Sequence, residues 1–344
     1  MFFGQVFFAV TMDPWESDLM GRASEIQKFL MSNGWSASER TVLAGDAGNR
    51  RYERLANPTK GQAVLMDADP KMGENVEPFL KIAMHLSTCS LSAPKIFAEN
   101  KSLGLILMQD FGDTLLFNIA EKSPSLELEL YRIALAALDQ LHQNSPPSGV
   151  GNYTAAEMAK AAGTTLAWYC NAELAAKVGV GLLHELKELD WSNPVLVLRD
   201  YHAQNLIYRQ EQAGLAQMGL LDFQDAQLGH PLYDSASLIH DARRSLNPAV
   251  ARQLKKDLEL KYGRSDDFLH AFSTLSAQRN LRVLAVFARL YLRDGKPGYL
   301  DLMPRVWNNL WQDLKHPRLS RLAKLCKALP KPNAEFRSDL RKNV

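Results

Sequence analysis

The chain has 344 residues, of which 46% are hydrophobic and 23% are charged, and its formal net charge is +2. This composition excludes disordered, collagen-like and disulfide-scaffold proteins, and the length exceeds that of a usual single core, so we expect two lobes. The three cysteines, Cys89, Cys170 and Cys326, form no Cys-x-x-Cys pair. Their spacing excludes a zinc knuckle or a redox motif and favours a reducing cytoplasm.

The first ten residues are apolar but lack a basic leader and a small-residue cleavage site, so they do not have the pattern of a signal peptide. A polar stretch opens at Met12, and we expect translation to start there, within an N-terminal extension of residues 1–23. No later segment approaches the roughly 18 uninterrupted apolar residues of a membrane span. We therefore expect no membrane partner.

Residues 24–110 have the pattern of a small lobe built mainly of strands. A helix is expected at Ser24–Ser32, where Asn33 and Gly34 stop it. One further helical pattern, at about 75–86, interrupts a series of short strand-like runs. These runs lie at residues 40–43, 51–55, 63–67, 95–98 and 103–108. Their order predicts a small antiparallel sheet with one packed helix.

Residues 111–344 are mainly helical and predict a second, larger lobe. Ser123 and Pro124 are typical of a helix start, and Thr154 with Glu157 forms a capping box. Further helices are expected at 180–189, 233–244, 249–262, 268–293, 301–314 and 318–328. The predicted fold class is therefore α+β.

Charge is unevenly distributed along the chain. Residues 251–344 hold 20 Lys and Arg against 9 Asp and Glu, a balance of +11, and the preceding residues carry −9. A basic segment of this kind can attract an anionic ligand or nucleic acid. The basic residues are also scattered at helical spacing without interleaved aromatic residues, which is typical of solvated helix faces. We favour the solvated faces and expect no nucleic-acid partner.

The helical half contains an exception at residues 194–226. An apolar run at 195–198 ends next to Asp200, and two short strands at 206–208 and 218–221 are joined by a turn. This arrangement would bring Asp200, Asn205 and Asp222 to one point. Phosphoryl transfer requires an acidic group to orient the acceptor and metal ions to neutralise phosphate charge, and Mg²⁺ prefers carboxylate and amide oxygens.

The spacing of these three residues matches two motifs of kinases. Asn205 follows Asp200 by five residues, as in the kinase catalytic loop, and Asp222 with Phe223 matches the Asp-Phe pair that binds metal. Asp and Asn also favour ordinary loops, so each residue alone could be a turn former. Their joint order favours a catalytic and metal-binding core.

Three segments resemble the aminoglycoside phosphotransferase and choline kinase superfamily, whose members share the bilobal protein-kinase-like fold. They are Leu198–Asn205, Gly219–Ala226 and Gly229–Asp234, and the likeness extends from about residue 25 to 329. Within the superfamily the chain looks most like bacterial anomeric sugar kinases that phosphorylate N-acetylmuramate and N-acetylglucosamine in cell-wall recycling. The residues that carry this closer likeness are Gly45–Tyr52, Val64–Asp67, Leu221–Ala226, Gln278–Asn280 and Phe287–Leu290.

The resemblance implies ATP and Mg²⁺ as cofactors and a small-molecule acceptor, here an amino sugar. Asp200 would be the base or orienter of the acceptor hydroxyl, and Asn205 and Asp222 would hold Mg²⁺. His202 matches a histidine of the superfamily's catalytic loop and could either pack the loop or take part in the chemistry. Asp225 would contact substrate or brace the loop.

Other positions follow from the same resemblance or depart from it. Asp234 would tether the catalytic loop. Leu198 stands where the superfamily usually has a histidine, two residues before the catalytic Asp. The hydrogen bonds that this histidine makes to the scaffold must therefore come from other residues. Gln224 replaces a usual glycine and would restrict the backbone.

The nucleotide is expected to bind the small lobe. Gly45 and Gly48 would form a short phosphate loop, and the backbone of Met108, Gln109 and Asp110, near the lobe junction, would bind adenine.

The strand-three lysine that normally contacts the phosphates is replaced by Met66, so Glu74 or Glu77 loses the expected ion-pair partner. Arg50 and Arg51 are our candidates for the missing cation, because guanidinium groups suit phosphate oxygens. The alternative for both arginines is an exposed strand end.

Three functions remain open from the sequence. The first is a sugar kinase, the second is a kinase of an aminoglycoside, choline or an amino-alcohol, and the third is a catalytically silent nucleotide-binding protein. The sequence leaves open the acceptor hydroxyl and the oligomeric state.

Overall fold

The computed structural model describes residues 14–43, 49–263 and 265–342. The expected start at Met12 and the phosphate-loop residues Gly45 and Gly48 lie outside these ranges. The fold is α+β, as expected, and the chain forms two compact units. The first unit runs to Glu77 and takes in Lys95–Asp110, and the rest of the chain forms the second unit.

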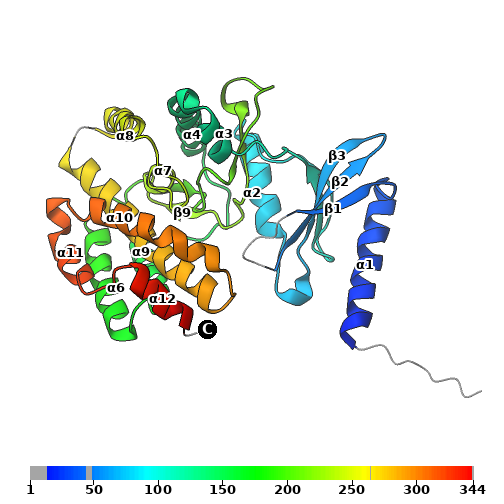
Figure 1. The fold of residues 1–344 in the computed structure, drawn as a ribbon. Helices are drawn as coiled ribbons and strands as arrows, with labels where there is room; N and C mark the ends of the chain where they lie inside the picture. Colours follow the sequence, from blue (N-terminus) through cyan, green and yellow to red (C-terminus); the bar gives the residue numbers. More distant parts are fainter. Residues whose placement is uncertain (1–13, 44–48, 264, 343–344) are drawn as a thin grey trace, which may run out of the picture. The chain divides into compact units, whose positions relative to one another are not determined.

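The first unit is an antiparallel five-stranded sheet with one long helix beside it (Figure 1). The strand order is β1-β2-β3-β5-β4, which confirms the expected antiparallel sheet. The elements are α1 (Pro14–Ser32), β1 (Glu39–Leu43), β2 (Arg51–Asn57), β3 (Gly61–Asp67), the short 3₁₀ turn Pro70–Met72, β4 (Ile96–Asn100) and β5 (Leu105–Gln109).

Helix α1 packs its apolar side against the sheet. Ile26, Phe29 and Leu30 recur at helical spacing and are buried. They form one core cluster with apolar residues that follow the helix in the sequence, namely Trp35, Leu55, Ala63, Leu65, Leu105 and Leu107. Burial of this stripe accounts for the position of the helix along the sheet.

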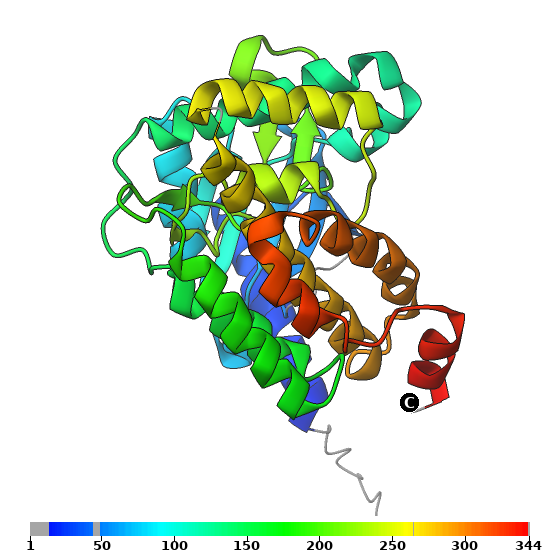
Figure 2. The same ribbon diagram turned by 90° about the vertical axis from the view of Figure 1, so that its left-hand side faces the viewer.

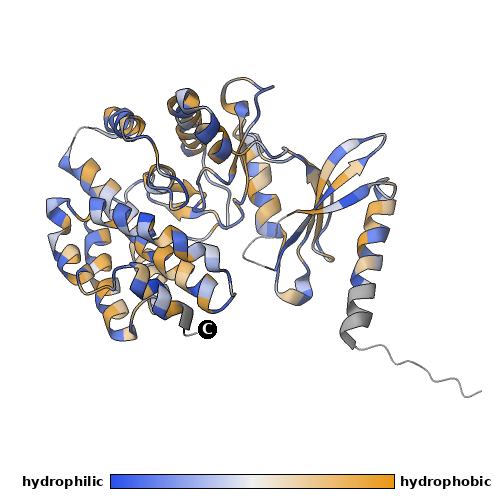
Figure 3. Ribbon diagram, viewed as in Figure 1, coloured by the Kyte–Doolittle hydropathy of each residue, from blue (hydrophilic) through white to orange (hydrophobic). Residues whose placement is uncertain are grey.

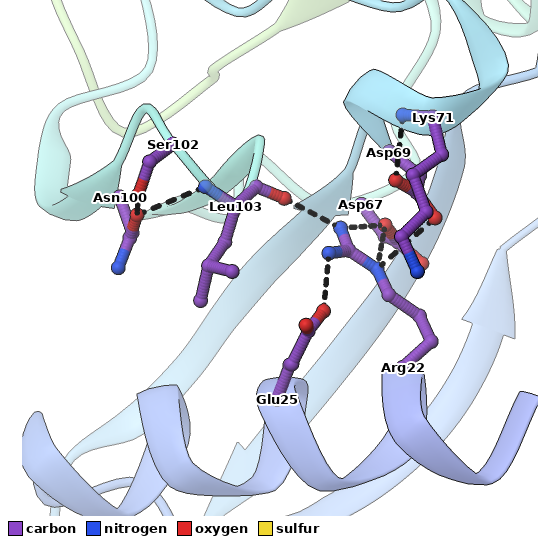
Figure 4. Close-up of polar contacts among 8 residues, drawn as sticks. All are labelled: Arg22, Glu25, Asp67, Asp69, Lys71, Asn100, Ser102 and Leu103. Atoms are coloured by element: carbon purple, nitrogen blue, oxygen red, sulfur yellow. Dashed lines mark hydrogen bonds and ion pairs between the residues drawn. The ribbon is translucent and has the colours of Figure 1, made fainter. Parts of the chain in front are cut away.

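A polar cluster anchors the same helix to the end of β3 (Figure 4). The Arg22 guanidinium donates from Nη2 to Asp67 Oδ1 at 2.5 Å and to the Leu103 carbonyl at 2.7 Å. Its Nη1 donates to Glu25 Oε2 at 3.0 Å. One side chain therefore links the helix, the strand end and the loop before β5.

The second unit is mainly helical (Figure 2). Its helices are α2 (Glu77–Thr88, all but the first residue), α3 (Leu116–Lys122), α4 (Glu127–His142), α5 (Ala155–Leu166), α6 (Ala172–Lys187), α7 (Tyr233–Ile239), α8 (Pro248–Tyr262), α9 (Asp266–Leu292), α10 (Met303–Asp313), α11 (Ser320–Cys326) and α12 (Ala334–Lys342). Among the described residues, no helix is both long and apolar enough to span a bilayer.

Two small sheets and several 3₁₀ turns complete this unit. Strand β6 (Val195–Val197) pairs with β9 (Gln227–Gly229), and β7 (Leu206–Tyr208) pairs with β8 (Met218–Leu220). The 3₁₀ turns are Pro124–Leu126, Gly214–Gln217, Pro297–Leu302 and Pro317–Leu319. Strand β9 and helix α12 were not expected from the sequence.

The capping signals explain where the helices begin and end. The box of Thr154 and Glu157 is present at the start of α5, as expected. Helix α6 begins at Ala172 instead of residue 180, because the Asn171 side chain accepts from Leu174 N at 2.9 Å and caps it. Helix α7 ends at Ile239 instead of 244.

The central helix of the second unit is α9. Most of its 27 residues are buried, including charged and polar ones. Its hydropathy is accordingly mixed, as are those of the neighbouring helices (Figure 3). Because most of α9 is buried, several of its polar side chains lie in the interior of the second unit, where they need hydrogen-bond partners.

The helix at 75–86 is expected in the lobe with the sheet, whereas α2 belongs to the second unit from Pro78 onward. Phe79 stacks on Phe223 with ring centroids 4.8 Å apart. Lys81 donates to the carbonyl of Ser148 at 3.2 Å. Helix α2 thus supports the segment that follows Asp222.

Candidate active site

The β7–β8 hairpin aligns the two predicted metal-binding residues. Leu206 pairs with Leu220 in the antiparallel register, and Leu221 N donates to the Asn205 carbonyl at 3.0 Å. Asn205 therefore enters the hairpin on one strand where Asp222 leaves it on the other. The turn between two short strands, expected from the sequence, produces this pairing.

Asn205 joins the three candidate residues through its side-chain amide. Its Nδ2 donates to the Asp200 carbonyl at 2.8 Å and to Asp222 Oδ2 at 3.1 Å. The amide nitrogen makes both bonds, and no described residue donates to the amide oxygen of Asn205. The structure thus gathers Asp200, Asn205 and Asp222 in one place.

Buried side chains hold the loop that carries Asp200. Asp234 accepts from Leu198 N at 2.6 Å and from Arg199 N at 2.9 Å. Burial raises the pKa of the Asp234 carboxyl to about 7, although the two backbone amides lower it. The expectation that Asp234 tethers the loop is confirmed.

Three further bonds fix the middle of the same loop. The hydroxyl of Ser237 donates to the Tyr201 carbonyl at 2.9 Å, and the Tyr201 hydroxyl donates to the Ala134 carbonyl at 2.7 Å. Asp241 Oδ2 accepts from Ala203 N at 3.2 Å. These contacts supply the scaffold bonds that Leu198 cannot form.

His202 lies inside the loop with 4% of its surface exposed. Burial lowers the pKa of its imidazole well below the ordinary value, and the charges of Arg243 and Arg279 lower it further. The ring is therefore neutral at physiological pH. This position favours packing over direct chemistry.

The backbone around Asp222 explains why a glutamine can follow Phe223. Asp222 has a φ of 56°, in the left-handed region, whereas Gln224 has no positive φ. Gln224 therefore has a conformation open to any residue, and the restriction expected from a side chain there conflicts with nothing in this backbone. Its side chain instead donates from Nε2 to Asp222 Oδ1 at 2.7 Å, and so orients the carboxylate.

One residue next to Asp200 is not among those expected from the sequence. Arg282, on α9, places Nη2 at 3.7 Å from Asp200 Oδ1. Arg279 lies one turn earlier on the same helix and is buried. Two arginines at i and i+3, directly before the apolar run at 283–288, were the signal that could have found them.

Asp225 is exposed beside these groups. Its carbonyl accepts from Arg199 Nη1 at 3.3 Å, and the Arg199 guanidinium lies 4.7 Å from the ring centre of Tyr153. The backbone of Asp225 thus braces Arg199, the neighbour of Asp200.

The oxygen donors of the residues at this point have the chemistry that would suit a magnesium ion. Within the described ranges, no three His, Cys, Asp or Glu side chains cluster as a metal cage. Mg²⁺ is usually held by one or two carboxylates together with substrate phosphates and water. The oxygens of Asn205 and Asp222 match that donor set.

The predicted phosphate cations lie in the first unit. Arg50 Nε is 3.2 Å from Glu74 Oε2, so Glu74 has a cationic partner although Met66 has replaced the lysine. Met66 is fully buried in β3. Arg51, at the start of β2, is exposed.

The three residues proposed for adenine binding lie at the end of β5 and just beyond it. Met108 is buried and pairs with Val64 of β3. The Gln109 amide donates to the Lys95 carbonyl at 2.8 Å. The Asp110 carboxylate forms a two-point ion pair with Arg54, at 2.5 and 3.2 Å.

Comparison with known proteins shows the family of the chain. A model of the phosphotransferase enzyme family matches residues 39–268. A relative from Caulobacter vibrioides, named N-acetylmuramate/N-acetylglucosamine kinase, is 32% identical, with 86% of this chain and 93% of the relative covered. A relative of the same name from Pseudomonas aeruginosa is 29% identical, with 89% and 94% covered.

Solved structures agree at the level of the fold. An amicoumacin kinase in complex with AMP-PNP and Ca²⁺ has a TM-score of 0.61 at 14% identity and covers 86% of this chain and 96% of its own. A choline/ethanolamine kinase family protein from Mesorhizobium loti has a TM-score of 0.59 at 14% identity, with 90% and 99% covered. They confirm the expected kinase-like fold. Because the family model spans more than half of the chain, this protein belongs to the phosphotransferase enzyme family.

Proposed function

We propose that the enzyme transfers the terminal phosphoryl group of ATP, with Mg²⁺, to a hydroxyl of an amino sugar of the N-acetylmuramate and N-acetylglucosamine type. The names of the relatives at 32% and 29% identity support this acceptor class. The observation that carries the chemistry is the contact of Asn205 with Asp222 and with the backbone of Asp200.

The roles of the residues follow from their chemistry. Asp200 orients the acceptor hydroxyl and takes its proton, while the oxygens of Asn205 and Asp222 hold Mg²⁺, which when bound neutralises charge on the phosphate oxygens. Arg282 keeps the Asp200 carboxylate oriented. His202 supports the loop from inside.

In this proposal, residues of the first unit bind ATP. Arg50 and Arg51 contact the phosphates in place of the missing lysine, and Glu74 orients Arg50 through their ion pair. Gly45 and Gly48 complete the phosphate loop, and the backbone from Met108 to Asp110 binds adenine. The reaction takes place in the cytoplasm and needs neither nucleic acid nor a membrane.

The test is a phosphorylation assay with ATP, Mg²⁺ and a panel of acceptors, with products identified by mass. We expect phosphorylated amino sugars and no product from aminoglycosides or choline. Product from a cationic acceptor alone would support the second function left open by the sequence. No product from any acceptor, together with ATP binding in a thermal-shift titration, would support the silent protein.

Asp200→Asn is the control for the assigned chemistry. It should lower kcat by roughly 10²- to 10⁴-fold, the usual range for a general base, while ATP binding in the thermal-shift titration persists. Normal turnover by this variant would contradict the role of Asp200.

A further inference from the structure

The second unit contains a hollow near the C-terminal end of the catalytic loop, where Gln204 lines it. Its volume is about 620 Å³, within the range of small-molecule sites. The lining includes Phe117, Gln204, Arg243, Lys296 and Tyr299. Gln204 lies four residues after Asp200, so the Cα atoms of the two are at most about 14 Å apart along the chain.

The lining of the hollow is cationic. It includes Arg243 and Lys296 and no carboxylate. Among the described residues, no hydrogen bond or ion pair joins either side chain to another residue, although, after the hydrogen bond from Arg293, the charge of Lys296 also acts on Asp294 and lowers the pKa of that carboxyl. The nearby carboxylate of Asp294 is engaged by Arg293, at 2.6 and 3.0 Å. Two cations without an anion therefore line one cavity, which fits a negatively charged ligand.

The position of Arg243 is set by the residue that also sets the catalytic loop. Asp241 is 1% exposed; its Oδ1 accepts from Arg243 N at 2.8 Å and its Oδ2 accepts from Ala203 N at 3.2 Å. Arg305 donates to the Arg243 carbonyl. Asp241 therefore bonds to the backbone of Arg243, beside the hollow, and to the backbone of the loop that carries Asp200.

Aromatic side chains provide the apolar part of the lining. Tyr299 packs against Phe287 with ring centroids 5.1 Å apart, which restrains the tyrosine ring. The amide of Phe117 donates to the Ala203 carbonyl at 3.0 Å, which ties this wall to the catalytic loop as well. A hollow with aromatic walls and two cations suits a sugar that carries an acidic substituent.

We propose that this hollow is the acceptor subsite that binds a carboxylate on the sugar, with Arg243 and Lys296 as the groups that bind it. The inference rests on the proposed function, because it assigns part of that function's acceptor to named residues. It predicts that the two residues determine the preference for an acidic over a neutral amino sugar.

The test compares two acceptors that differ by the acidic substituent, N-acetylmuramate and N-acetylglucosamine. In Arg243→Met and in Lys296→Met, the KM for the acidic sugar should rise about ten-fold more than that for the neutral sugar, because a charge-assisted hydrogen bond is lost. Lys296→Arg, which keeps the charge, should retain most of the wild-type preference for the acidic sugar. Lys187→Met, an exposed lysine of α6, is the matched control and should keep the wild-type ratio.

Equal changes for both acceptors, or an unchanged KM ratio in both Met variants, would overturn the subsite. Calorimetric titration of N-acetylmuramate in the presence of a non-hydrolysable ATP analogue separates this result from failure of the proposed function. If the wild-type protein phosphorylates neither sugar, the proposed function fails. In that case the subsite is supported if the wild-type protein binds N-acetylmuramate and Arg243→Met weakens this binding at least ten-fold. It is overturned if both proteins bind N-acetylmuramate equally, or if the wild-type protein does not bind it.

Discussion

The carboxylate of Asp234 holds Arg199 in a left-handed backbone conformation. Arg199 has a φ of 70°, and its amide donates to Asp234 Oδ1 at 2.9 Å. A residue with a side chain in this region carries strain of about 1 kcal/mol or more. Because Arg199 immediately precedes Asp200, the buried Asp234 determines the direction in which the catalytic loop begins.

Asp234→Asn should impair both stability and turnover. An amide offers one acceptor oxygen in place of two, so its NH₂ group would face one of the two backbone N–H groups. We expect unfolding free energy to fall by about 1–3 kcal/mol and kcat to fall on the order of 10²-fold through misplacement of Asp200. Denaturant unfolding and steady-state kinetics measure these effects. Glu188→Gln, at an exposed position, is the control, and wild-type kcat in Asp234→Asn would refute the tether.

Arg282→Gln should lower kcat about ten-fold with little change in the KM for ATP. The guanidinium lies 3.7 Å from Asp200 Oδ1, so its removal leaves that carboxylate less well oriented. Arg282→Lys keeps the charge and should retain part of the activity. Arg289→Gln makes the same change seven residues farther along the same helix, at an arginine for which no ion pair with Asp200 is found among the described residues. Equal kinetics for Arg282→Gln and Arg289→Gln would show that the ion pair has no catalytic role.

The double variant Arg50→Met, Arg51→Met should raise the KM for ATP at least ten-fold, because phosphate contacts by guanidinium groups are strong charge-assisted bonds. Glu74→Gln should give a smaller increase, since it removes the partner of Arg50 at 3.2 Å but keeps both cations. Calorimetric titration with a non-hydrolysable ATP analogue measures the affinities. Unchanged affinity and turnover in the double variant would show that these arginines do not take the place of the lysine that Met66 replaces.

His142 should make the fold less stable in acid. Burial, with the charge of Lys261, lowers the pKa of its imidazole from 6.5 to about 4. Between those pH values the unfolded chain binds a proton that the folded protein does not, so stability falls as pH falls from 6.5 toward 4. Neither ring nitrogen has a hydrogen-bond partner among the described residues.

His142→Leu tests this linkage without removing a hydrogen bond. From pH 7.5 to 5.5, the wild-type protein should lose about 1 kcal/mol more unfolding free energy than the variant. Urea unfolding at the two pH values measures the difference. Parallel losses in both proteins would mean that His142 titrates normally in the folded state.

The elements of this protein were readable from local sequence where a repeating pattern or a cap determines the structure. The strands of the first sheet, the long α9 and the capping box at Thr154 follow from short-range rules of burial and backbone hydrogen bonding. Errors occurred where a distant residue changes the local preference. Helix α7 stops at Ile239, where the next residues turn and Asp241 bonds to Ala203 N of the catalytic loop.

The sequence by itself determined the identity of the catalytic candidates, because Asp200, Asn205 and Asp222 lie in a short hairpin whose geometry is local. Only the tertiary structure decided what surrounds them. Arg282 reaches Asp200 from a position 82 residues farther along the chain, and Glu74 pairs with Arg50, 24 residues before it. Ion pairs and cavities depend on the packing of distant segments, and a linear pattern of residues carries no direct measure of that packing.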